Sequence, residues 1–199
     1  MLTDGQIDRY ARHILLREVG GKGQERLLAA SVSITGLAGA GGWLVSWLAL
    51  AGVGRILVAD ARPVGPDDVL PLLTAADVGS RRDEAIARAV PAFNPDARVE
   101  LAAGEPVDLR LAIGLPPGGD AGTSLWLHVA GDEVLICPPG ERLCGACAAA
   151  LRGDPPTATA AALAGSVAGA EALLHLLGRS AGRRALHFRA GEPFRCPHG

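Results

Sequence analysis

A glycine-rich turn followed at a fixed distance by an acidic residue is the first candidate site in this sequence. The turn runs from Gly36 to Gly42, and Asp60 follows Gly36 by 24 residues and Gly41 by 19. Backbone N–H groups at the start of a helix can face a phosphate, while an acid at the end of the next strand can reach ribose hydroxyls. The spacing therefore predicts a nucleotide site with Asp60 as the ribose acid.

The turn departs from the dinucleotide fingerprint G-x-G-x-x-G at its centre. Gly36 and Gly41 fill the first and last glycine positions and Gly39 lies between them, but Ala38 stands at the middle position. A glycine there normally lets the backbone approach the pyrophosphate. Trp43 also places a large ring in the first turn of the helix. The structural alternative is that this stretch is only the hydrophobic centre of an α/β sheet.

The cysteines depend on the compartment for their interpretation. No signal peptide is recognisable at the N-terminus, and no apolar run approaches the roughly 20 residues that span a bilayer, which predicts a cytoplasmic protein without a membrane segment. In a reducing compartment, four cysteines favour metal binding or free thiols over disulfides. Cys144 and Cys147 form a C-x-x-C, for which a redox pair or two inert thiols are the alternatives, and the apolar surroundings of Cys137 predict a buried thiol.

The elements that position these residues begin with a β-α-β unit. Its parts are a strand at Ser31–Thr35, an apolar helix at Gly42–Ala51 and a strand at Arg55–Ala59. Further elements are expected as helices at Gln6–Leu16, Gln24–Ala30 and Thr157–Leu177, and as strands at Leu109–Leu115, Leu125–Val129 and Glu133–Cys137. The predicted fold class is α/β, with a Rossmann-like, mostly parallel sheet, helices on both faces and a zinc-bound C-terminal edge.

Length and composition limit the partners. A chain of 199 residues with 49% hydrophobic content predicts one domain, with N-terminal helices over 1–30, a Rossmann-like core over 31–115 and a C-terminal part over 125–199. A net charge of −2 and a pI near 6.2 give no basic surface for nucleic acid or an anionic membrane.

The order of motifs resembles the ThiF/MoeB/HesA superfamily of adenylyltransferases, which are similar to ubiquitin-activating enzymes. The resemblance rests on RYARHILL, GQERLLAASV, the glycine turn, LALAGVGRILVAD, DVGSRRDEAIARAV and FNPDARVE, which cover nearly all of Ile7–Val99 in order. It implies ATP on the glycine turn, adenylation of the C-terminal carboxylate of a ubiquitin-like or sulfur-carrier protein, and a dimer. The dimer is predicted to form through the helical face of the sheet near the glycine turn, with Leu44, Trp47 and Leu48. The resemblance also implies that Arg12 reaches the partner subunit's ATP site, that Asp60 is the ribose acid, and that Arg82 replaces a lysine.

Several positions depart from the family pattern D-x-D-x-V-x-x-x-N-x-x-R-Q. Arg62 replaces the second aspartate, Asp68 the asparagine and Pro71 the arginine that touches phosphate. The family's magnesium aspartate is missing after the strand near Leu109–Leu115, where Asp120 is the nearest carboxylate. The sequence therefore predicts weak or absent binding of ATP and magnesium.

The resemblance also implies a structural zinc, since the family binds one with a C-x-x-C after the sheet and a second pair near the C-terminus. The predicted ligands are Cys144, Cys147, Cys196 and His198, three thiolates and one imidazole in a known tetrahedral combination.

These features bear on three hypotheses of function. The leading hypothesis is a degenerate, non-catalytic member that acts through protein partners in a carrier-protein or peptide-modifying pathway, as a homodimer or a heterodimer with a related adenylyltransferase. The alternative is an active ATP-dependent adenylyltransferase of a ubiquitin-like or sulfur-carrier C-terminus, using Arg82 and Asp120. A nicotinamide oxidoreductase would need the middle glycine of the fingerprint and a substrate domain.

Overall fold

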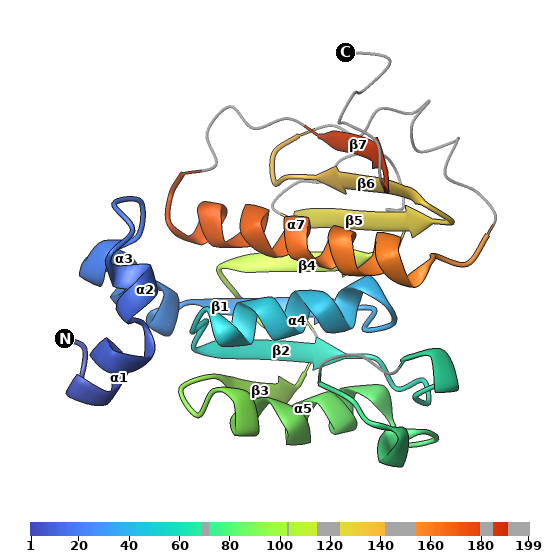
Figure 1. Cartoon of the computed structure of the whole chain (residues 1–199), viewed down its shortest axis with the longest axis horizontal. Coiled ribbons are helices and arrows are strands. Elements are labelled where there is room, and N and C mark those ends of the chain that lie inside the picture. Colours follow the sequence, from blue (N-terminus) through green and yellow to red (C-terminus); the bar gives the residue numbers. More distant parts are fainter. Residues whose placement is uncertain (69–71, 103, 115–123, 142–153, 180–184, 191–199) are drawn as a thin grey trace.

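The computed structural model describes residues 1–68, 72–102, 104–114, 124–141, 154–179 and 185–190. Its seven described strands form one sheet in the order β3-β2-β1-β4-β5-β6-β7 (Figure 1). Neighbours from β3 to β5 are parallel, and β5–β6 and β6–β7 are antiparallel. The strands are β1 Ser31–Thr35, β2 Arg55–Ala59, β3 Arg98–Leu101, β4 Leu109–Ile113, β5 Ser124–Ala130, β6 Glu133–Cys137 and β7 Leu186–Arg189. The prediction of a mostly parallel sheet is confirmed.

The β-α-β unit is formed as the sequence predicts. Ser31–Thr35 and Arg55–Ala59 are β1 and β2, paired in parallel with Ser31 opposite Arg55. The helix between them, α4, spans Ala40–Leu50 and starts two residues before the predicted Gly42. Parallel strands joined through a helix must turn at the end of β1, so the glycine turn lies at the carboxyl edge of the sheet.

The remaining helices differ from the prediction mainly at the N-terminus. Besides α4, the described helices are α1 Asp4–Arg9, α2 Ala11–Ile14, α3 Gly20–Ala29, α5 Arg82–Phe93 and α7 Ala158–Leu176, with 3₁₀ turns η1 Pro66–Asp68 and η2 Ala75–Asp77. The predicted helix Gln6–Leu16 is two short helices, and Thr3 caps the first of them. Gly20 and Gly21 begin α3, which therefore starts four residues before the predicted Gln24. Local propensity is a weak constraint, and α3 packs against α2 and α7.

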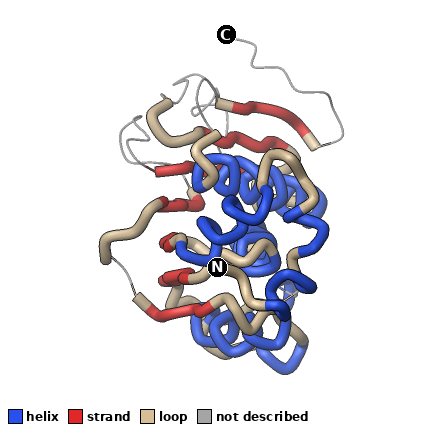
Figure 2. Tube along the Cα trace, turned by 90° about the vertical axis from the view of Figure 1, so that its left-hand side faces the viewer, coloured by secondary structure: helices blue, strands red, loops and turns tan. Residues whose placement is uncertain are grey.

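The helices that cover the sheet lie on one face of it in the described part of the chain. Figure 2 shows α4, α5 and α7 together on one side of the strands. Both β1–α4–β2 and β2–α5–β3 are crossovers that step in the same direction along the sheet, which places right-handed connections on the same face. The prediction of helices on both faces is therefore met on one face only among the described residues.

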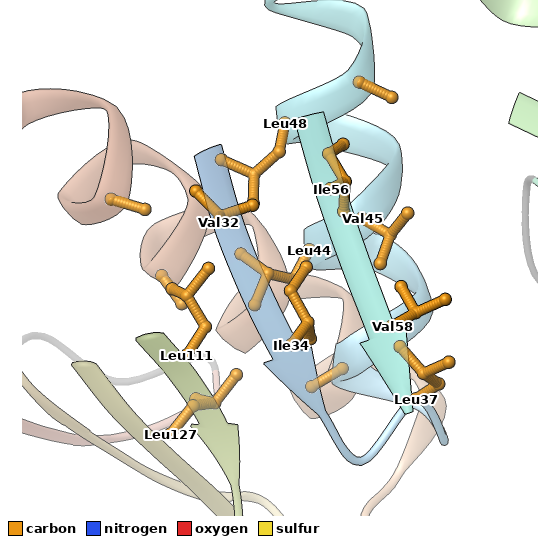
Figure 3. Close-up of a cluster of buried hydrophobic side chains, with 14 of the residues drawn as sticks. Val32, Ile34, Leu37, Leu44, Val45, Leu48, Ile56, Val58, Leu111 and Leu127 are labelled. Atoms are coloured by element: carbon orange, nitrogen blue, oxygen red, sulfur yellow. The ribbon is translucent and has the colours of Figure 1, made fainter. Parts of the chain in front are cut away.

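The core fills the layer between this face and the helices. Alternate residues of β1 and β2, namely Val32, Ile34, Ile56 and Val58, are at most 1% exposed and meet Leu44 and other apolar residues of α4 (Figure 3). On β1 burial alternates because successive side chains point to opposite faces of the sheet, whereas on β2 the intervening Leu57 is buried as well. This packing holds the glycine turn rigidly at the end of β1.

Helix α7 corrects one expectation. It is 19 residues long and, by length and composition, apolar enough to span a bilayer, although no apolar run of that length was expected. It packs against α4, β5 and β6, and half of its most apolar window is buried inside the protein. Its composition therefore reflects its place as a core helix.

Candidate functional site

The glycine turn is shaped by contacts that require glycine. Gly36 has φ +82°, and a Cβ on it would lie 3.0 Å from the carbonyl oxygen of Ile113 at the end of β4. A Cβ on Gly41 would overlap the carbonyl oxygen of Gly36. Gly39, with φ +51°, is the N-cap of α4. Two of the three predicted glycines thus have left-handed backbones, and the third allows the helix to approach the turn closely.

Asp60, at the end of β2, points back under the turn. Its side chain is 3% exposed. Oδ2 accepts from the Leu37 amide at 2.9 Å, from Arg62 Nη2 at 2.7 Å and from Arg82 Nη1 at 3.0 Å. Oδ1 accepts from Arg62 Nε at 2.7 Å and from the Arg62 amide at 3.2 Å. Five donors meet a carboxylate that offers about four lone-pair positions, so Asp60 is saturated within the chain.

These contacts determine the protonation of Asp60. Burial raises the pKa of its carboxyl group, but hydrogen bonds from Arg62, the Leu37 amide and Arg82 outweigh burial and hold the pKa far below its ordinary range. In turn, the hydrogen bond to Asp60 raises the pKa of Arg62. Asp60 is therefore an ionised acceptor with no free lone pair.

Arg82 is a buried part of the same cluster. Its side chain is 8% exposed and donates to Asp60, to Asp68 through Nε and Nη2, and to the carbonyl oxygen of Pro63 at 3.0 Å. Asp68 also accepts from the Gly65 amide at 2.9 Å. The structure therefore brings the predicted Asp60 and Arg82 together, but Arg82 braces the loop after β2 and is not directed to a phosphate.

A second aspartate–arginine pair lies beside this cluster. Asp83, on the first turn of α5, accepts from the Asp60 amide at 3.3 Å and pairs with Arg81 through Nε at 3.1 Å and Nη2 at 2.9 Å. The hydrogen bond from Arg81 outweighs burial and lowers the pKa of Asp83. This pair joins the end of β2 to the start of α5.

Arg12 is not brought to this site. It lies in α2, at the edge of the sheet where the parallel strands begin, opposite the arrowheads that mark the glycine turn and Asp60 (Figure 1). Arg12 is exposed and makes no hydrogen bond or ion pair with any residue that the structure describes. Within one chain it cannot reach Asp60.

The predicted zinc ligands Cys144, Cys147, Cys196 and His198 lie outside the described residues, as do Pro71 and Asp120. Among the residues that are described, no group of three or more His, Cys, Asp or Glu side chains is placed to hold a metal. Cys137 is fully buried, as predicted, with Sγ 3.4 Å from the carbonyl oxygen of Glu141.

Arg62 is the residue whose importance the sequence did not reveal. In the sequence Arg62 is only the replacement of the second aspartate of the family pattern. In the structure its side chain donates to both carboxylate oxygens of Asp60. The signal was present in the spacing, because an arginine two residues after a strand-end aspartate can fold back on it. Arg81 and Asp83 have the same two-residue separation in reverse order.

Comparison with known proteins finds relatives of the N-terminal half of the chain. Residues 10–107 match the model of the ThiF family. The SAMP-activating enzyme E1 of Haloferax volcanii is 38% identical over 108 residues, which are 53% of this chain and 38% of that protein. The sulfur carrier protein adenylyltransferase of Thermus thermophilus is 38% identical over 100 residues, 49% of this chain and 37% of its own length. The match therefore covers well under half of the length of these relatives.

Solved structures share the fold. Escherichia coli MccB crystallised with ATP superimposes with a TM-score of 0.75 at 18% identity, over 94% of this chain and 70% of MccB. PaaA gives a TM-score of 0.74 at 17% identity, over 98% of this chain and 73% of PaaA. The architecture thus extends beyond residues 10–107 to almost the whole chain.

Proposed function

Because this chain belongs to the ThiF family of the E1-like adenylyltransferase superfamily, we propose that it is a non-catalytic member that acts through protein partners. The observation that carries the proposal is the saturated Asp60. An acid that must accept ribose hydroxyls needs free lone pairs, and here Arg62, Arg82 and the Leu37 amide use them. The residues present do not fit an ATP ribose.

The position of Arg82 argues in the same direction. Phosphoryl and nucleotidyl transfer depend on cations placed against the phosphates. Arg82 stands where the family has a lysine, yet its donors are directed to Asp60, Asp68 and the Pro63 carbonyl oxygen. The alternative, an active adenylyltransferase that uses Arg82 and Asp120, would require Arg82 to leave these buried partners.

The partners follow from the relatives. The Thermus relative is named for a sulfur carrier protein, the Haloferax relative for SAMP, and MccB was crystallised with MccA. We assign this chain to the same kind of pathway, one that modifies a carrier protein or peptide, as a homodimer or the partner of a catalytic relative. The exposed Arg12, distant from its own Asp60, would then serve a partner's nucleotide site.

The test is pyrophosphate exchange with purified protein and candidate carrier proteins, with the Thermus adenylyltransferase assayed in parallel as the active control. We expect no exchange above the level without protein. Calorimetry with ATP and magnesium should give no dissociation constant tighter than about 10 μM, about −7 kcal/mol. Carrier-dependent exchange would replace this proposal with the active alternative.

A further inference from the structure

The two arginines on Asp60 are held very differently. The Arg82 side chain is 8% exposed and has Asp68 and the Pro63 carbonyl oxygen as additional acceptors. The Arg62 side chain is 65% exposed, and within the described part of the chain all its hydrogen bonds go to Asp60. Exposed ion pairs contribute little to stability, while removing one partner of a buried pair is costly. Arg62 is therefore the arginine that the fold can release.

Arg62 also has the geometry of a substitute ligand. Its Nε and Nη2 approach Oδ1 and Oδ2 of Asp60 at 2.7 Å each, as two parallel donors across one carboxylate. A vicinal cis-diol presents two O–H donors to the same pair of oxygens. The guanidinium group thus occupies the place that the two ribose hydroxyls would take, and its removal withdraws one donor from each oxygen.

We propose that the Arg62 side chain closes the cis-diol subsite at Asp60 and can be displaced from it, whereas the buried Arg82 side chain stays bound to Asp60. The proposal rests on the proposed function, since it explains why Asp60 is not available to nucleotide. One exposed residue then closes the cis-diol subsite, and this closure can be tested independently of the residues replaced at the phosphate and magnesium positions. A ribonucleoside without phosphates is the ligand class that the opened subsite would take.

The experiment measures adenosine binding to the wild type and to Arg62→Ala by calorimetry or ligand-observed NMR. Adenosine carries the diol but no phosphate, so the replaced phosphate arginine does not enter the measurement. We expect Arg62→Ala to bind adenosine at least about tenfold more tightly than the wild type, as the release of a competing charged donor pair predicts. The gain should be absent with 2′,3′-dideoxyadenosine, which lacks both hydroxyls.

Arg81→Ala is the matched control. Arg81 is also about half exposed and also forks onto a buried aspartate two residues away, Asp83, but in the described part of the chain its side chain pairs with Asp83 and Glu84 and not with Asp60. It should leave adenosine affinity unchanged. Arg62→Lys should gain less than Arg62→Ala, because an ammonium group can still donate to Asp60 although it cannot fork.

Three results would overturn the proposal. They are an adenosine affinity of folded Arg62→Ala within twofold of the wild type, an equal gain for Arg81→Ala, and an equal gain with the dideoxynucleoside. Failure of both Arg62→Ala and Arg62→Gln to fold would also overturn it, because a displaceable side chain cannot be required for folding. None of these outcomes affects the proposed function, which fails only if the wild type itself catalyses exchange or binds ATP.

Discussion

At the scale of single residues, the N-terminal motif is tied to the core by a buried tyrosine. The Tyr10 hydroxyl donates to Asp96 at 3.1 Å and accepts from Asn94 Nδ2 at 2.8 Å, while the same Asn94 amide donates to the Ala49 carbonyl oxygen. Arg9 also pairs with Asp96 at 3.1 Å. The residues of RYARH and FNPD therefore hold α1 and α2 against the ends of α4 and α5.

This network predicts a measurable titration. Tyr10 is the only tyrosine of the chain, so phenolate absorbance reports it alone. Burial, with contributions from Asp96, raises the pKa of Tyr10 to about 12, against about 10 for an ordinary tyrosine. We expect a spectrophotometric midpoint near 12 for the folded protein and near 10 in denaturant. A midpoint near 10 in the folded protein would refute the network.

The raised pKa of Tyr10 makes the free energy of unfolding depend on pH. Because the pKa of Tyr10 is higher in the folded than in the unfolded chain, its contribution is complete below pH 10 and is lost as the pH rises from about 10 towards 12. Tyr10→Phe should remove this dependence and lower the free energy of unfolding at pH 7 by about 1–2 kcal/mol, since Asn94 and Asp96 lose a buried partner. Urea unfolding at several pH values measures both effects.

Residue types and spacing predicted part of the site. The sequence predicts both Asp60 and Arg82, and in the structure Arg82 Nη1 lies 3.0 Å from Asp60 Oδ2. What the sequence could not show was the direction of their donors and acceptors. The prediction placed Arg82 in the nucleotide site as the replacement of a lysine, and Arg62 as the replacement of an aspartate. The ion pairs instead depend on how the loop after β2 folds back, which involves Asp68 as well.

At the scale of elements, the α4–α7 contact organises the helical layer. Gly165 of α7 lies directly against α4: a Cβ on it would be 2.5 Å from the Ala40 carbonyl oxygen, 2.6 Å from Trp43 Cβ and 3.1 Å from the Leu44 amide nitrogen. Two of these three neighbours are backbone atoms, which cannot rotate away. The glycine therefore sets how closely the two helices approach.

Gly165→Ala should accordingly destabilise the protein despite the better helix propensity of alanine. We expect a loss of about 1–3 kcal/mol in the free energy of unfolding, because an added methyl group in a close-packed contact forces the helices apart. Gly21→Ala in α3 is the control, since a Cβ there meets nothing within 4 Å. It should be neutral or stabilising by about 0.5–1 kcal/mol. Equal effects of the two substitutions would show that Gly165 does not set the helix spacing.

The sequence predicted α7 well but not its role. Its expected span Thr157–Leu177 differs from Ala158–Leu176 only by the N-cap Thr157 and the C-cap Leu177. The partner helix could not be identified, because periodicity says which face is small and nothing about which distant helix meets it.

At the scale of the whole molecule, the C-terminal edge should carry a structural zinc. Metal analysis of protein purified without chelator is expected to show about one zinc per chain, and chelation should lower the melting temperature. Cys144→Ser should lose the metal. Cys137→Ser is the matched control, because Cys137 is buried against the Glu141 carbonyl oxygen and is not a predicted ligand. Less than a tenth of an equivalent in the wild type would contradict the site.

Most of the predicted dimer surface on α4 is buried within the chain. Leu44 and Leu48 of α4 were predicted to contribute to it together with Trp47, but both are 0% exposed within the chain. Trp47 and Leu50 are the exposed residues of α4, at 42% and 46%, and Trp43 is partly buried. The sequence could not distinguish an apolar helix face that meets a partner from one that meets another helix of the same chain.

The surface left for a partner combines these two residues with the end of α2. Leu15 and Leu16 are 85% and 51% exposed, and a hollow beside α2 is lined by His13, Trp47 and Leu50. Exposed apolar residues gathered near one element are typical of an interface. Arg12 lies on the same short helix α2, so a partner that covers this surface would be close to the arginine that the family sends across its dimer.

For a homodimer, light scattering of the isolated protein should therefore give about twice the chain mass of 20.3 kDa. For a heterodimer, the chain should form a mixed complex with a catalytic relative. Trp47→Glu should shift the assembly to the monomer, because a charge buried at an apolar interface is costly. Leu101→Glu is the control, since Leu101 is 51% exposed on the edge strand β3, and it should leave the mass unchanged. Arg12→Ala tests whether Arg12 contributes to the partner's nucleotide site without being needed for the complex. The complex should persist while the partner's activity falls. A monomer that co-purifies with no adenylyltransferase would exclude this surface as an interface, and Arg12 would then be an ordinary solvated arginine.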